Sequence, residues 1–127
     1  MKGDITNRTE VEHLVNFFYD KINADLILGP IFNQQAQVNW DKHLPIMYDF
    51  WETLLFGKTA YKGMPFPKHL NFGLQPDHFE KWLKLFFETV DELFVGTVAD
   101  KAKIKATHIA SVFQVRMGLK PTVIKVI

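Results

Sequence analysis

The chain contains no cysteine, and this absence excludes several kinds of chemistry. Without thiols there is no disulfide framework, no thiolate metal site and no cysteine nucleophile, while a reducing compartment is permitted. An excess of charge of one sign is also missing, because 15 basic and 14 acidic residues are interspersed and leave a formal net charge of +1. No basic stripe or acidic tail therefore indicates a nucleic-acid partner.

Long hydrophobic runs are absent too. A membrane-spanning helix needs roughly 18 or more consecutive apolar residues, and no segment approaches that length. The first ten residues, MKGDITNRTE, contain no apolar segment of the signal-peptide type. The motifs HExxH and GxSxG and a glycine-rich phosphate loop are also missing, so nothing points to hydrolysis or phosphoryl transfer. We expect a cytoplasmic protein with no membrane partner.

Apolar and aromatic residues, by contrast, are abundant. Hydrophobic residues make up 47% of the 127 residues, which is enough to build one core. We expect a single domain over residues 1–127, with extended segments at residues 1–8 and 118–127. The 12 Phe, 3 Trp and 3 Tyr exceed what a plain helical bundle of this length needs. A bulky core accounts for that surplus, and a pocket lined with rings is the alternative.

Apolar residues recur at intervals of three and four, which predicts helices over about residues 9–24, 40–56, 76–95 and 99–117. Thr9 and Glu12 have the spacing of a capping box, which places the start of the first helix there. Pro45 lacks an amide hydrogen, so regular helix in the second segment is expected only from about residue 43 or 44. The third helix has apolar residues over most of its circumference and is expected to be buried on most sides.

Two shorter segments connect these helices. LGPIFN, residues 28–33, predicts a compact turn or short helix with Ile31 and Phe32 pointing inward. Three glycines and two prolines in residues 57–75 exclude a long helix and leave one helical turn at Pro67–Asn71. His69 lies in this turn. The arrangement fits either an ordinary four-helix bundle or a shortened globin.

Some of the polar residues could form a haem site. His69 follows Lys68, and Phe66, Leu70 and Phe72 flank the pair, so one turn holds a candidate iron ligand, a propionate partner and porphyrin contacts. A lone histidine beside apolar residues is, however, more often an ordinary surface or core residue.

Three further polar residues are predicted on inward helix faces. They are Tyr19, His43 and Trp82, one on each of the first three long helices. Hydrogen-bonding groups on three inward faces are costly in an inert core but useful around a buried polar ligand. The remaining histidines, His13, His78 and His108, are interpreted as structural.

Several motifs together resemble one family. The segments FFYDKI, LGPIFN, a Trp two residues before a Lys-His pair, the following FW, PFPKHL and FEKWLKLF occur in the order found in group III truncated haemoglobins, at similar separations. The resemblance covers about residues 10–117, and the absence of Gly-Gly pairs agrees with it. It implies an all-α truncated globin, a two-over-two helical sandwich around haem b, which is iron protoporphyrin IX.

The resemblance also implies roles for individual residues. His69 would be the proximal iron ligand, Tyr19 the main distal hydrogen-bond donor, His43 the distal histidine and Trp82 the distal indole. Lys68 would meet a propionate. Pro45 leaves the role of His43 open, because a late helix start could turn its ring outward as a gate or inward as a sixth iron ligand. The expected lining residues are Phe18, Phe32, Met47, Trp51 and Phe72.

The function that this implies is tight oxygen binding in a polar distal pocket. Oxygen, with nitric oxide as a further gas ligand, would be the partner, together with an unidentified reductase. Nitric oxide dioxygenase-like or peroxidase-like activity stays open, and slow oxygen release suits such chemistry better than oxygen transport. Two alternatives also stay open: a haem-free helical interaction or sensor domain, and a gas or redox sensor with His43 on the iron.

Overall fold

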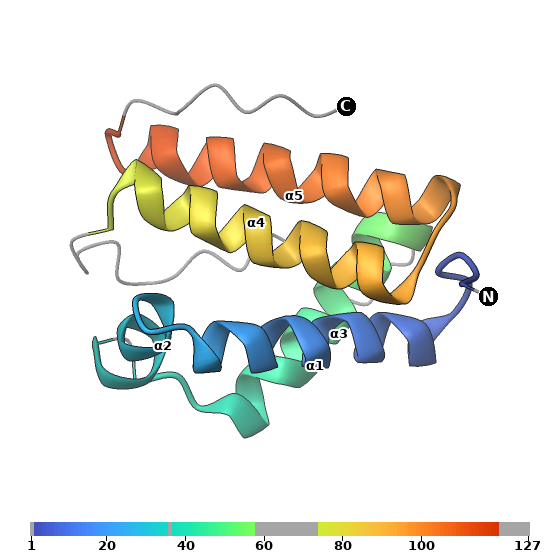
Figure 1. The fold of residues 1–127 in the computed structure, drawn as a ribbon, viewed down its shortest axis with the longest axis horizontal. Coiled ribbons are helices and arrows are strands. Elements are labelled where there is room, and N and C mark those ends of the chain that lie inside the picture. Colours follow the sequence, from blue (N-terminus) through green and yellow to red (C-terminus); the bar gives the residue numbers. More distant parts are fainter. Residues whose placement is uncertain (1, 36, 58–73, 120–127) are drawn as a thin grey trace.

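A computed structural model describes residues 2–35, 37–57 and 74–119 of the chain. The long helices are α1 (Arg8–Ala24), α3 (Trp40–Phe56), α4 (Pro76–Leu93) and α5 (Thr97–Arg116). Between α1 and α3 lie the short helix α2 (Leu28–Pro30) and the π-helix η1 (Ile31–Gln35). Figure 1 shows α1 and α3 in one layer and α4 and α5 in the other. This arrangement confirms the predicted all-α, two-over-two class.

Helix α1 begins one residue earlier than predicted, and its cap is a different residue. Asn7 is the N-cap, and its side-chain oxygen accepts a hydrogen bond of 3.1 Å from the amide of Glu10. The Glu10 carboxylate in turn accepts from the backbone amide of Thr6 at 2.7 Å. The capping box predicted from Thr9 and Glu12 is therefore wrong, because asparagine is a stronger N-cap than threonine and lies three residues before another glutamate.

Helix α3 begins at Trp40, so the predicted late start is wrong. The carbonyl of Asn39 accepts hydrogen bonds from the amides of Lys42 at 3.2 Å and His43 at 2.8 Å, and these bonds hold the first turn ahead of Pro45. Pro45 has no amide hydrogen, so the helix lacks one backbone hydrogen bond there. The first turn, before Pro45, still forms. Gly57, with φ of 71°, ends the helix as predicted.

Contacts with the N-terminal segment determine where α4 ends and where α5 begins, and both boundaries differ from the predicted ones. Helix α4 starts at Pro76 as predicted but stops at Leu93, because the next residue, Phe94, forms a β-bridge with Gly3. Helix α5 starts at Thr97, two residues early, because the Asp4 carboxylate accepts from two amides of its first turn. Residues 2–7 are thus packed against the fold.

Helix α4 is less buried than predicted. Glu80, Lys84 and Glu88 are exposed along one side, while the buried face holds Phe79, Leu83, Phe86, Thr89 and Val90. The helix is therefore amphipathic, and the expectation of burial on most sides is wrong. The further apolar residues Trp82, Leu85 and Phe87 lie at the borders of the buried face and are half-buried.

Aromatic stacking joins the two layers. Phe86 on α4 stacks on Trp51 of α3, with ring centroids 4.9 Å apart, and meets Phe18 of α1 edge-on at 5.1 Å. Both Phe18 and Phe86 are almost completely buried. These contacts fix the spacing of the layers at the centre of the molecule.

Some predictions fall outside the described residues. They include the turn at Pro67–Asn71 with Lys68 and His69, the neighbouring Phe72, and the tail from residue 120 onward. Within the described ranges, no helix is long and apolar enough to cross a membrane.

Candidate functional site

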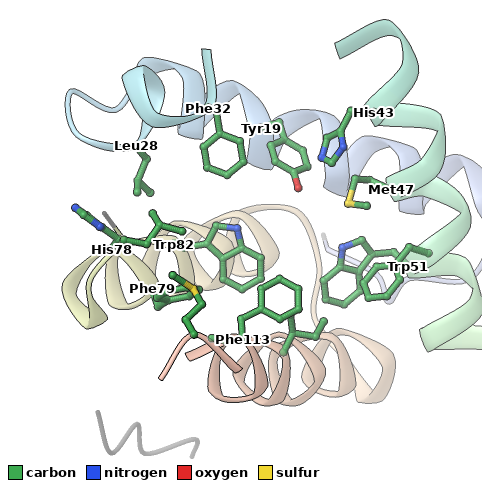
Figure 2. A pocket seen from close by; sticks show the side chains of 15 residues that line it. Tyr19, Leu28, Phe32, His43, Met47, Trp51, His78, Phe79, Trp82 and Phe113 are labelled. Carbon is green, nitrogen blue, oxygen red and sulfur yellow. The ribbon is translucent and has the colours of Figure 1, made fainter. Parts of the chain in front are cut away.

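A cavity of about 140 Å³ lies between the two layers. One water molecule needs roughly 10–15 Å³ by this measure, so the space is far larger than a packing defect. Side chains from both layers surround it (Figure 2). The lining residues are Tyr19, Leu28, Phe32, His43, Met47, Phe50, Trp51, Leu74, His78, Phe79, Trp82, Ile109, Ala110, Phe113 and Met117.

Tyr19 points its hydroxyl into this cavity (Figure 2). Helical spacing turns the residue inward on α1, and it is only 7% exposed. Among the described residues the hydroxyl has no hydrogen-bond partner, although buried tyrosine hydroxyls usually find one. Burial raises the pKa of Tyr19, so the group keeps its proton and can act as a donor.

Two indole rings also turn their N–H groups toward the cavity (Figure 2). Trp82 stacks on Phe86 at 5.9 Å and meets Phe18 edge-on at 5.4 Å, so its ring is held from two sides. Trp51 stacks on the same Phe86. Neither indole nitrogen has a hydrogen-bond partner in the described part of the chain. The fixed rings therefore present two donors to whatever occupies the cavity.

His43 lines the cavity beside Tyr19, and their ring centroids are 5.6 Å apart in an edge-on arrangement. The first turn of α3, which forms despite Pro45, turns this residue inward. Burial lowers the pKa of His43, so the imidazole is neutral at pH 7 and offers one donor and one acceptor nitrogen.

Together these groups form a small polar cluster in an apolar cavity. These donors reach the surface of the cavity without a protein partner among the described residues, and burying such a donor completely would cost about 1–3 kcal/mol. A core gains nothing from several such donors, whereas a small polar ligand held among apolar walls would satisfy them. The chemistry of the cavity is thus to enclose an apolar group and to donate hydrogen bonds to a polar atom beside it.

The predicted site residues divide into three groups. The structure brings Tyr19, Phe32, His43, Met47, Trp51 and Trp82 together around the cavity. Phe18 is absent from the lining and lies behind it, packed against Trp82 and Phe86. His69, Lys68 and Phe72 lie outside the described residues.

Sequence reasoning missed other lining residues. Ile109, Ala110, Phe113 and Met117 follow the apolar spacing that predicted the last helix, so a signal for them existed. His78, interpreted as structural, lines the cavity and also caps α4, since its Nδ1 accepts from the amide of Gln75 at 2.9 Å. No sequence pattern distinguishes this double role from capping alone. The lining residues from elsewhere are Leu28, Phe50, Leu74 and Phe79.

Comparisons with known proteins identify the family. The model of the family described as "Bacterial-like globin" matches residues 4–116. A "Group 3 truncated hemoglobin" of Campylobacter jejuni is 35% identical over 118 residues, which cover 90% of this chain and 93% of that protein. The chain is a group III truncated haemoglobin. The crystal structure of a group III truncated haemoglobin from Campylobacter jejuni superimposes on this globin with a TM-score of 0.80, at 33% identity, covering 92% of this chain and 95% of that one.

Membership of the globin family implies haem binding and an oxygen-related function. The side chains that line the cavity fit haem binding independently of the family match. Aromatic and aliphatic side chains from both layers suit a flat macrocycle, and the unpartnered donors of Tyr19, Trp51 and Trp82 suit a polar ligand at its face.

Proposed function

We propose that this globin holds haem b between its two helical layers, with His69 as the iron ligand and Lys68 beside a propionate. Tight oxygen binding is the function proposed for the site. The observation that supports it most is the placement of the Tyr19 hydroxyl and the Trp82 N–H in an apolar cavity, without partners among the described residues. The assignment of His69, Lys68 and Phe72 rests on the sequence motif PFPKHL and its neighbours.

Haem supplies the iron to which a diatomic gas attaches. The residues around the cavity would then decide how long the gas stays. A bound gas that carried partial negative charge would accept a charge-assisted hydrogen bond from a donor beside it, and such a bond is stronger than a neutral one. Tyr19 and Trp82 approach from different layers, so both can donate to the gas. His43 in its neutral form adds a third donor or orients the Tyr19 hydroxyl.

The apolar walls have a separate task. Phe32, Met47 and Phe113 surround the donors and exclude water, which strengthens each hydrogen bond to the gas. Slow oxygen release suits redox chemistry on the gas better than oxygen transport. Nitric oxide dioxygenase-like and peroxidase-like reactions, supplied with electrons by a reductase, are therefore the activities to assay. A cytoplasmic location and a single domain remain part of the proposal.

The experiment that tests the proposal is an absorption spectrum of the purified protein in its ferric, ferrous and carbonyl forms. We expect a Soret band in the wild type, its loss in His69→Ala, and an unchanged band in the control His108→Ala, whose side chain is exposed on α5. An undiminished band in His69→Ala would contradict the ligand assignment.

Two other spectra would favour the alternatives. A colourless wild-type protein, expressed with ample haem precursor, would indicate a haem-free interaction or sensor domain. A six-coordinate ferrous spectrum that becomes five-coordinate in His43→Ala would indicate a sensor with His43 on the iron.

A further inference from the structure

Trp40 lies directly behind the distal residues without lining the cavity itself. Its ring centroid is 5.1 Å from that of Tyr19, 5.7 Å from that of His43 and 6.1 Å from that of Phe32, on which it stacks. These three neighbours all line the cavity. Trp40 is partly exposed, so it forms a second layer between the distal side and the solvent.

Hydrogen bonds through the side chain of Asn33 hold the Trp40 ring in place. Its indole N–H donates to the side-chain oxygen of Asn33 at 2.8 Å. The Asn33 amide donates in turn to the side-chain oxygen of Asn23 at 2.7 Å and to the carbonyl of Gly29 at 2.9 Å. Through one side chain, Asn33 thus connects the end of α1, the short helix α2 and the start of α3.

His43 depends on this arrangement because it has little else to hold it. Its imidazole makes no hydrogen bond with the described residues, and its ring contacts there are those with Tyr19 and Trp40. A histidine side chain without a hydrogen bond can change between staggered rotamers unless packing prevents it. Trp40, which does not line the cavity, packs edge-on against the His43 ring.

We infer that Trp40, anchored by Asn33, is a positioning residue that keeps His43 turned toward Tyr19 and closes the distal side of the cavity. This inference rests on the proposed function, since it concerns how a gas enters and leaves the same site. Trp40 and Asn33 do not line the cavity, but through His43 they would set the rate at which the gas enters it. The movable part is the His43 ring, and the restraint is the ring of Trp40.

The test is the rate of carbon monoxide rebinding after flash photolysis of the ferrous protein, measured in a set of variants. Trp40→Ala removes both the ring contacts and the indole N–H, and we expect rebinding from solvent to become about two- to tenfold faster, the factor that one lost aromatic pair corresponds to. Trp40→Phe keeps a ring but loses the N–H, so its effect should be smaller and in the same direction. Asn33→Ala should match Trp40→Phe and add nothing in the double variant.

A matched control separates positioning from general loosening of the α1–α3 contact. Tyr48 on α3 donates to Asn16 on α1, and Tyr48 does not line the cavity. Tyr48→Phe removes this hydrogen bond between the same two helices, and we expect the rebinding rate to stay at the wild-type value. Equal acceleration in Tyr48→Phe and Trp40→Phe would overturn the inference.

A second measurement does not depend on gas kinetics. The His43 ring is titrated by NMR in the diamagnetic carbonyl form, and we expect Trp40→Ala to move the pKa of His43 upward toward that of an exposed histidine. A fall in melting temperature with unchanged rebinding and unchanged His43 titration would show a merely structural role and overturn the inference. If the wild type carries no haem, the proposed function fails, and the same titration on the protein as purified still decides whether Trp40 holds His43.

Discussion

At the scale of single residues, the distal side of this globin combines donors from different elements. Tyr19 comes from α1 and Trp82 from α4, and each ring is fixed by neighbouring aromatic rings. Fixed donors lose little conformational entropy when a ligand arrives, so their hydrogen bonds contribute nearly in full. The proposed oxygen affinity therefore depends mainly on these two side chains.

The first prediction concerns Tyr19 and Trp82. Tyr19→Phe keeps the ring and removes the hydroxyl, and we expect the oxygen dissociation rate to rise roughly tenfold to a hundredfold, because one charge-assisted hydrogen bond contributes about 1.5–3 kcal/mol. Stopped-flow displacement of oxygen by carbon monoxide measures the rate. Trp82→Phe tests the second donor in the same way. Unchanged dissociation in the double variant Tyr19→Phe, Trp82→Phe would contradict the donor assignment.

At the scale of elements, a residue distant in the sequence caps α5. The two carboxylate oxygens of Asp4 accept from the amides of Val98 at 2.9 Å and Ala99 at 2.8 Å. Gly96 makes room for this contact, because a Cβ there would lie 2.5 Å from the Asp4 carboxyl carbon, and its φ of 142° disfavours other residues. The N-terminal segment thus supplies a cap that the residues before α5 do not provide.

The second prediction follows from this cap. Burial pushes the pKa of Asp4 upward, but hydrogen bonds from the backbone amides of Val98, Ala99 and their neighbours outweigh it and lower the pKa. A lowered pKa in the folded state means that Asp4 stabilises the fold above its ordinary value near 3.8 and loses that contribution as the pH falls through the folded value. Asp4→Ala should cost about 0.5–2 kcal/mol at pH 7, as loss of an N-cap does.

Urea unfolding at several pH values measures this effect. The difference in unfolding free energy between wild type and Asp4→Ala should be constant from pH 7 to about pH 5 and shrink below pH 4. Asp20→Ala, at an exposed position on α1, serves as the control and should leave the stability close to that of the wild type. A difference that does not depend on pH would show that the carboxylate charge has no part in the cap.

At the scale of the whole molecule, the layers meet through Phe86, on which both Trp51 and Trp82 stack. The same ring therefore contributes to the core and supports two of the donors of the cavity. The cavity is lined by side chains from both layers (Figure 2). Stability and the geometry of the proposed site are coupled through this contact.

The third prediction tests that coupling. Phe86→Ala should lower the unfolding free energy by about 3–5 kcal/mol, as other deletions of buried aromatic rings do, and denaturant unfolding measures it. Phe86→Leu refills most of the volume and should cost less than half as much. We also expect faster oxygen release from Phe86→Leu than from the wild type, because Trp82 loses its stacking partner. Wild-type release from Phe86→Leu would show that Phe18 alone holds the Trp82 ring.

Local patterns in the sequence predicted most of the helices. The apolar spacing of α1 and α3, Pro76 at the start of α4 and Gly57 at the end of α3 act within a few residues, so no distant contact was needed to identify them. The inward direction of Tyr19, His43 and Trp82 followed from the same periodicity. His69 on the iron stays a prediction that rests on the sequence.

The tertiary structure alone decided features that depend on distant residues. Helix α4 ends and α5 begins where Gly3 and Asp4 reach them, and those contacts span about ninety residues of sequence. Periodicity shows that a side chain faces inward, but it does not show whether it reaches a cavity or packs behind one. Phe18 packs behind Trp82, and Trp40 packs behind His43. The packing of the two layers determines these positions, because it determines which side chains each inward face contacts.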